Sequence, residues 1–177
     1  MIYFKSKYLA ERLHINLAKW KRWSREFLDP DPLGGYQSGF ARQFSFKEAF
    51  RVFLGGHLVG ILYFTIPQAG RILYDLNPWL RDNQFYIWPM PNGAPLENKR
   101  RCIYIYEPGK GRYGYAVRSI VLQDHPRSNG AHEEVYTLEL IGWSNKAYAS
   151  QRLTHARMID VDALHHYFLQ RVANANG

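Results

Sequence analysis

The chain has 177 residues, of which 46% are hydrophobic and 16% aromatic, so it can build a packed core and is not disordered. Its 23 Lys and Arg exceed its 15 Asp and Glu, and the formal net charge of +8 favours an anionic partner such as nucleic acid. A single cysteine, Cys102, excludes an internal disulfide, and the longest apolar run, residues 53–66, is too short to cross a bilayer. We therefore expect a cytoplasmic protein with no membrane partner.

The first 30 residues predict two short helices joined by a three-residue turn. Ser6 is placed to cap a first helix of about two turns, and Asn16 is placed to cap a second helix over residues 17 to about 27. The sequence DPDPLGG then ends the second helix, because prolines and glycines interrupt helical hydrogen bonding. Two helices joined in this way are typical of a helix-turn-helix.

The second of these helices separates apolar from cationic side chains. At about 100° per residue, one side carries Leu17, Trp20, Ser24, Phe27 and Leu28, with Trp23 at its edge. The opposite side carries Ala18, Arg22 and Arg25, and it is flanked by Lys19 and Lys21. We expect an aromatic anchor facing the core and a cationic surface facing outward. Whether Trp23 packs inward or reaches a DNA backbone stays open at this stage.

The remaining elements of the N-terminal half are predicted from turn and capping signals. Residues 36–44 are expected to form a small hairpin around a turn. Ser45 and Glu48 have the spacing of a capping box, and Thr65, followed by Pro67, predicts the start of a fourth helix. This part of the chain is expected to end near residue 80.

The C-terminal half changes to the pattern of β-strands. Four strands are predicted, over the sequences QFYIWPM, CIYIYEP, YAVRSIVLQ and EEVYTLELIGW, and a closing helix begins at Asp160. The predicted fold class is therefore α+β, with a helical domain over residues 1–80 and a small antiparallel β-rich domain with a C-terminal helix over residues 81–177. Aromatic residues are expected to share one face of the sheet, for packing, ligand binding or oligomerisation: Tyr104, Tyr106, Tyr113, Tyr115, Tyr136 and Trp143.

The motifs of enzymes, metal sites and cofactor sites are weak or missing in this sequence. The sequence GKGRYG matches a dinucleotide-binding pattern, but a second strand-like segment follows it, which favours a hairpin turn. His165 and His166 are neighbours on a helix and do not have the i, i+4 spacing of a metal pair. NKRRC, residues 98–102, is a small basic cluster that we expect to be a solvated loop end. We therefore expect a binding protein with no cofactor and no metal rather than an enzyme.

Residues 3–80 resemble the MerR-type winged helix-turn-helix DNA-binding family. YLAERLHINLAKWKRWSREFL is similar to its two-helix reader, with WKRW at mid-helix, and LYFTIPQAGRIL is similar to its turn into a fourth helix. SGFARQFSFKEAFRVF is similar to its wing strand and next helix start, where the match falls on Phe44, Ser45 and Glu48. The chain departs from the family after residue 80, where prolines and strands replace the long helix that usually forms a dimer.

These patterns together predict a protein that binds specific sequences in double-stranded DNA and regulates transcription. Arg22 and Arg25, with Ala18 and Lys21, are expected to face the major groove. Lys19 and Lys5 or Lys7 are expected to contact phosphates. The segment from Tyr36 to Arg42 is expected to form a wing over the adjacent DNA backbone or minor groove.

One helix-turn-helix covers few base pairs, so we expect a homodimer that forms through the C-terminal domain. Two alternatives use the same winged domain. One is a phage-type adaptor for DNA packaging or excision. The other is a regulator whose C-terminal domain senses a small-molecule or protein effector.

Overall fold

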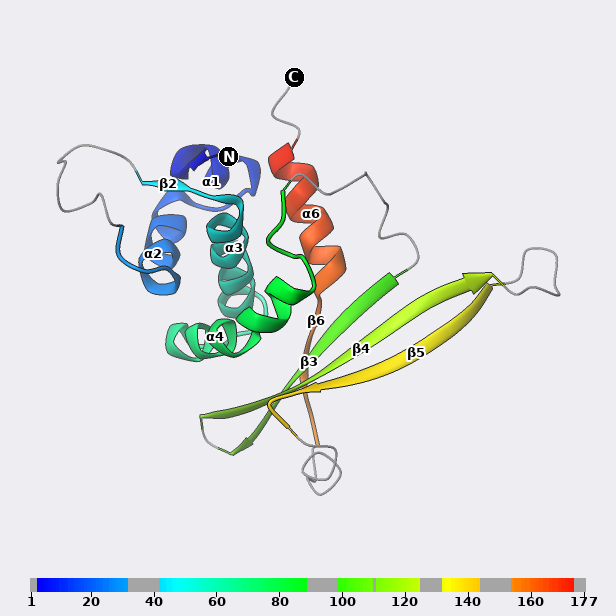
Figure 1. Ribbon diagram of the computed structural model, residues 1–177. Coiled ribbons are helices and arrows are strands. Elements are labelled where there is room, and N and C mark those ends of the chain that lie inside the picture. Colours follow the sequence, from blue (N-terminus) through cyan, green and yellow to red (C-terminus); the bar gives the residue numbers. More distant parts are fainter. Residues whose placement is uncertain are drawn as a thin grey trace. The chain divides into compact units, whose positions relative to one another are not determined.

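A computed structural model describes residues 3–31, 42–88, 99–109, 111–124, 132–143 and 154–173, and it has an α+β fold (Figure 1). The chain forms two compact units: unit 1 contains residues 1–89 and 165–177, and unit 2 contains residues 90–164. The closing helix that we placed in the C-terminal domain therefore contributes its later residues to unit 1. Within the described ranges, no helix combines the length and the apolar character needed to span a bilayer.

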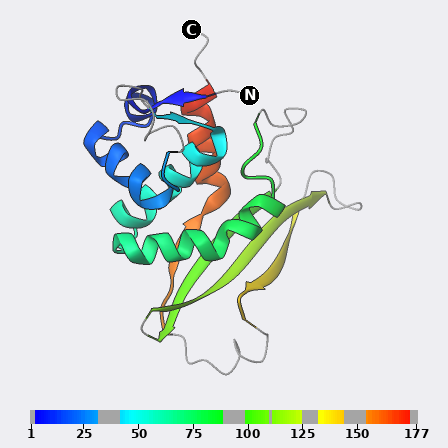
Figure 2. The ribbon, with the colours of Figure 1, turned by 60° about the vertical axis from the view of Figure 1, so that its left-hand side comes forward.

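Unit 1 is built from helices and one pair of two-residue strands. Strands β1 (Phe4–Lys5) and β2 (Gln43–Phe44) pair in antiparallel fashion and lie side by side in Figure 2. This pairing was missed from the sequence, which suggested a hairpin within residues 36–44 instead; residues 36–41 lie outside the described residues. The helices are α1 (Ser6–Arg12), α2 (Leu17–Phe27), α3 (Phe46–Gly60), α4 (Ile66–Asp82) and the part of α6 (Val161–Ala173) from residue 165 onward.

The predicted helix starts are confirmed in four of five cases. The Asn16 side chain accepts hydrogen bonds from two backbone N–H groups, and Asp160 accepts one from Ala163 N at 3.0 Å. Ser45 with Glu48 forms a complete capping box at the start of α3, and Thr65 with Gln68 forms one at the start of α4. The prediction for Ser6 is wrong: it is the first helical residue, and the N-cap position is Lys5, which makes no side-chain capping bond.

The first predicted strand, QFYIWPM, is not a strand over its described residues 84–88. Helix α4 continues past residue 80 to Asp82, and Gln84 then adopts a left-handed conformation (φ 65°) that turns the chain back. This turn buries Phe85, whose ring lies 6.2 Å from that of Phe50 and 5.6 Å from that of Trp79, between centroids. Tertiary packing of one aromatic side chain thus overrides the local preference for a strand.

The core of unit 1 is aromatic. Phe168 of α6 is fully buried, and its ring lies 5.3–5.5 Å from three rings of α3, those of Phe46, Phe50 and Phe53. His165 is also buried, edge-on to the ring of Phe50 at 4.8 Å. Aromatic pairs of this kind stabilise a fold beyond the burial of their area. The C-terminal residues of the chain are therefore part of the unit that carries the predicted DNA-binding helices.

Unit 2 is an antiparallel four-stranded sheet with the strand order β5-β4-β3-β6. Its strands are β3 (Lys99–Gly109), β4 (Arg112–Asp124), β5 (His132–Ile141) and β6 (Arg157–Asp160), and Figure 1 shows the first three as long twisted ribbons. GKGRYG is confirmed as a hairpin turn between β3 and β4, with Gly111 at φ 73°, a conformation that glycine adopts without strain.

Side chains alternate across this sheet, so the predicted aromatic residues do not all share one face. Strand pairing places Tyr104, Tyr106 and Tyr136 on one face, which we call the tyrosine face. Tyr115 points to the opposite face and is buried. The ring of Trp143 lies 5.8 Å from that of Tyr106, on the side of the tyrosine face.

The NKRRC cluster is not a solvated loop end over its described residues. Lys99 to Cys102 belong to β3, and Arg101 is buried with Asp162, which accepts hydrogen bonds from the Arg101 guanidinium at 2.6 and 2.9 Å and from its backbone N–H at 2.6 Å. Arg100 is exposed and pairs with Asp160. Two of these cations therefore stabilise unit 2 internally.

Candidate nucleic-acid interface

Helices α1 and α2 are joined by a tight turn whose conformation is fixed by backbone hydrogen bonds. His14 adopts a left-handed conformation (φ 54°) after the end of α1, and Ile15 N donates to Ala10 O at 2.9 Å. Asn16 then starts α2 by accepting hydrogen bonds from Ala18 N at 2.9 Å and Lys19 N at 3.3 Å. Local interactions therefore define where α2 begins.

The inner side of α2 is anchored by aromatic side chains, as its projection predicted. Trp20 and Phe27 are buried, and the Trp20 ring meets the Phe44 ring edge-on at 5.7 Å. Among the described residues, the Trp20 indole N–H has no hydrogen-bond partner, so this side chain serves packing alone. Ser24 is satisfied by donating to Trp20 O at 2.8 Å. Leu17 differs from the prediction, since 37% of it is exposed at the first helical position.

Two adjacent glycines of α3 receive the anchoring rings. A Cβ atom on Gly55 would lie 2.5 Å from Phe27 Cδ2, and one on Gly56 would lie 2.4 Å from Trp23 Cζ3. Both distances are far below the normal carbon–carbon separation of about 3.5–4.0 Å. Trp23 therefore packs inward against α3, which answers the question that the sequence left open. The position of α2 therefore depends on glycine at both of these positions in α3, since any side chain there would collide with the rings.

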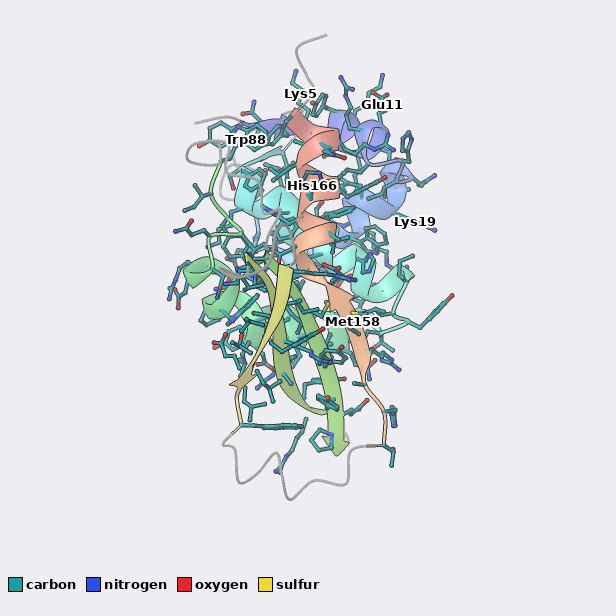
Figure 3. The ribbon with its side chains drawn as sticks, turned by 90° about the vertical axis from the view of Figure 1, so that its right-hand side faces the viewer. Lys5, Glu11, Lys19, Trp88, Met158 and His166 are labelled. Atoms are coloured by element: carbon teal, nitrogen blue, oxygen red, sulfur yellow. The ribbon has the colours of Figure 1, made fainter. Side chains whose placement is uncertain are left out.

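The outer side of α2 carries the predicted contact residues. Ala18, Lys19, Lys21, Arg22 and Arg25 are all exposed. Among the described residues, none of the four cations has a hydrogen-bonded or ion-paired side-chain partner. Figure 3 shows Lys19 extending outward from α2. The carboxylates nearest in sequence are Glu26, at the end of α2, and Asp29, just beyond the helix.

The predicted phosphate contacts lie at the start of the same unit. Lys5, on β1, and Lys7, on α1, are both exposed. Lys7 Nζ lies 3.9 Å from a Glu11 carboxylate oxygen, and with 79% and 66% of the two side chains exposed this pair holds the lysine only weakly. Tyr36, the first residue of the predicted wing, lies outside the described residues.

Arg42, the last residue of the predicted wing, is bound inside unit 1. Its Nη1 donates to Asp29 O at 2.9 Å, its Nη2 donates to Glu48 Oε1 at 3.1 Å, and the guanidinium lies over the Phe44 ring. Only 18% of this side chain is exposed. The geometry therefore assigns Arg42 a positioning role that joins the end of α2 to the start of α3.

Glu48 is the acidic partner in this arrangement. Burial raises the pKa of its carboxyl, but hydrogen bonds from the Ser45 N–H, the Ser45 hydroxyl and Arg42 outweigh burial and hold the pKa below its usual 4.5. The capping box of α3 and the Arg42 contact thus share one ionised carboxylate.

Arg51 is a positioning residue that sequence reasoning missed. Its Nε donates to Phe27 O at 2.9 Å, and its Nη1 donates to Asn77 Oδ1 at 3.3 Å, so it links the last residue of α2 to α4. A cation near the end of a helix also complements the helix dipole. The only sequence signal is a lone arginine within an otherwise apolar stretch of α3.

No family model matches this sequence, and no curated protein is a detectable relative. The function must therefore be inferred from the chain's own residues. The described residues hold no cluster of three or more His, Cys, Asp or Glu side chains placed to bind a metal ion. What the described residues of unit 1 do bring together is a pair of short helices with a rigid inner side and a cationic outer side.

Proposed function

We propose that this protein binds specific sequences in double-stranded DNA through α2 and acts as a transcriptional regulator. The observation that carries the proposal is the outer side of α2, where four cations without described partners stand opposite an aromatic anchor. Folding has already fixed the helix, so little further ordering is needed when it binds. The resemblance of residues 3–80 to MerR-type reader domains supports the same role.

Each contact residue has a task that follows from its chemistry. Arg22 and Arg25 read base edges in the major groove, because a guanidinium makes two hydrogen bonds to guanine. Ala18 lets the helix approach closely, Lys21 faces the groove beside the arginines, and Lys19 binds a phosphate.

Lys5 and Lys7 extend the phosphate contacts beyond α2. Tyr36 touches the adjacent backbone from the wing that the resemblance implies. Arg42 holds the base of that segment through its contacts to Asp29 and Glu48.

Selection of bound sequences from random duplex DNA tests the proposal directly. We expect an enriched motif with two half-sites. On that site, Arg22→Ala or Arg25→Ala should each weaken binding by about 1–3 kcal/mol and relax specificity at one position. The double variant Arg71→Ala, Arg81→Ala removes two exposed arginines elsewhere in unit 1 and is the matched control. Equal losses in this control and in the double variant Arg22→Ala, Arg25→Ala would refute base reading by α2.

Salt dependence separates phosphate contacts from base contacts. Lys19→Ala and Lys5→Ala should weaken binding to all duplexes alike and should each lower the slope of log K against log salt by about 1. The arginine variants should change affinity with less effect on this slope. An unchanged slope for the lysine variants would place their side chains away from the phosphates.

We also propose that the protein is a homodimer that forms through unit 2. Strand β5 supports this, since it is the ten-residue edge of the described sheet and the β4–β5 register runs from Tyr115–Ile141 to Asp124–His132 without a bulge. A long edge strand exposes unpaired backbone groups that a second copy can satisfy. Sedimentation equilibrium of the full chain should give twice the monomer mass of 20.8 kDa. A monomer at every concentration tested would contradict this.

A further inference from the structure

The tyrosine face of unit 2 has an open depression at its centre. Register pairs place Ala116 beside Tyr104 and place Arg118 beside Leu138. Because alanine is small, a depression of about 430 Å³ opens above it, lined by Tyr104, Tyr106, Ala116, Arg118, Tyr136, Thr137 and Leu138. Its walls are therefore aromatic rings and aliphatic side chains, with one guanidinium among them.

This face is exposed to an unusual extent for its composition. Tyr136 is 48% exposed, Leu138 is 57% exposed, and Met158, paired with Tyr104 across β3 and β6, is 43% exposed. Large apolar side chains exposed on one face commonly mark a binding surface. Tyr104 and Tyr106 are two residues apart on one strand, which spaces them by about 6.8 Å. Separate planar groups can thus contact separate rings.

The charge of the face indicates what binds there. The Arg118 guanidinium lies 4.6 Å from the centroid of the Tyr136 ring, so a cation is held at the aromatic surface. Asp160, which the β3–β6 register places on this face, is paired with Arg100. The tyrosine face therefore offers stacking surfaces and positive charge together.

This combination fits single-stranded nucleic acid better than a second copy of the chain. Two copies joined face to face around the depression would bring Arg118 toward its own counterpart, and like charges brought together in an interface are unfavourable. Unpaired bases stack on tyrosine rings and on arginine guanidinium planes, while phosphates are attracted to the cation. We propose that the tyrosine face binds single-stranded nucleic acid, a site separate from the duplex-reading helix of unit 1.

Fluorescence anisotropy with labelled 20-nucleotide single strands of DNA and RNA tests this proposal. We expect Tyr104→Leu and Tyr136→Leu each to weaken binding roughly 5- to 150-fold, the equivalent of about 1–3 kcal/mol per stacked base. Tyr136→Phe should retain most of the affinity, because it keeps the ring. Tyr74→Leu, which changes an exposed tyrosine of unit 1, is the matched control and should bind as the wild type does.

The result is independent of the duplex-binding proposal. The double variant Arg22→Ala, Arg25→Ala should keep its affinity for single strands. The two leucine variants should keep their affinity for the selected duplex. The proposal is overturned if the single strands do not bind, or if they bind equally to wild type and to both leucine variants when circular dichroism shows all three folded. It is also overturned if the leucine variants turn a dimer into a monomer, which would make this face a protein interface.

Discussion

Replacing Gly55 with alanine tests the packing that positions α2. The new Cβ would lie 2.5 and 2.6 Å from two Phe27 ring carbons and 2.9 Å from Leu73 Cδ1. Both neighbours are buried, with Phe27 4% and Leu73 1% exposed, so neither can swing into solvent. To restore contacts of about 3.5–4.0 Å, α2 or α4 must move by roughly 1 Å.

The size of the effect follows from two opposing terms. Overpacking a core by one methyl group costs about 1–3 kcal/mol, whereas alanine in a helix interior is more favourable than glycine by about 1 kcal/mol. Gly70, inside α4, supplies a matched control, because its Cβ would meet nothing within 4 Å. Gly70→Ala should therefore stabilise the protein by about 1 kcal/mol. The difference between the two variants isolates the steric term, and we expect it to be about 1–3 kcal/mol.

Urea denaturation followed by circular dichroism measures the free energy of unfolding of both variants. Gly55→Ala should also weaken duplex binding, because the displaced helix carries Arg22 and Arg25 at a changed angle, while Gly70→Ala should bind as the wild type does. If the two variants gain equal stability, the close approach of Phe27 to Gly55 is not a feature of the folded protein, and the anchoring of α2 must be explained differently.

Three further predictions concern stability. Hydrogen bonds hold the pKa of Glu48 below 4.5, so the contribution of its carboxylate to folding stability is complete above pH 4.5 and is lost as the pH falls through the folded pKa. The difference in Tm between the wild type and Glu48→Gln should therefore shrink on acidification. A difference that stays constant with pH would contradict this. Asp162→Ala removes the carboxylate that pairs with the buried Arg101 guanidinium and should cost about 3–5 kcal/mol in urea denaturation, whereas the paired replacement Arg101→Met, Asp162→Leu should cost much less; similar costs would show that the charges do not depend on each other. The backbone of Tyr63 is in the left-handed conformation (φ 56°), and its side chain is 82% exposed. Tyr63→Gly should therefore stabilise the protein by about 1 kcal/mol and raise Tm. A lower Tm would show that the tyrosine side chain contributes stability.

Features that depend on neighbouring residues in the chain were predicted well. Asn16, Ser45 and Thr65 mark helix starts because a capping side chain and its backbone partners lie within three residues of each other. The division of α2 into an aromatic inner side and a cationic outer side followed from helical geometry alone, although Leu17 is exposed. Helix caps and helix faces are local properties, which is why a single sequence reveals them.

Features that depend on distant residues were not predictable in the same way. The orientation of Trp23 is decided by Gly56 on another helix, and the turn at residues 84–88 is decided by where Phe85 finds aromatic neighbours. From the sequence, Arg101 is one of several expected surface cations. In the fold it is buried and hydrogen-bonded to Asp162, which lies 61 residues later. Each strand alternates its side chains between the two faces of the sheet, but the sequence does not say how neighbouring strands align. Only the strand register places Tyr136 on the same face as Tyr104 and Tyr115 on the opposite face.

The hydrogen bond from Arg42 to Asp29 has a consequence for how this protein can vary. It joins two residues that are 13 positions apart, and Glu48 holds the same arginine in place. Insertions or deletions between these two positions would change the length of a closed loop without moving its ends. Doubling the length of such a loop costs only about 0.6 kcal/mol in closure entropy. The segment between Asp29 and Arg42 can therefore change in length and chemistry while α2 keeps its place, so, under the proposed function, the reach of the domain and the sequence that it reads can evolve separately.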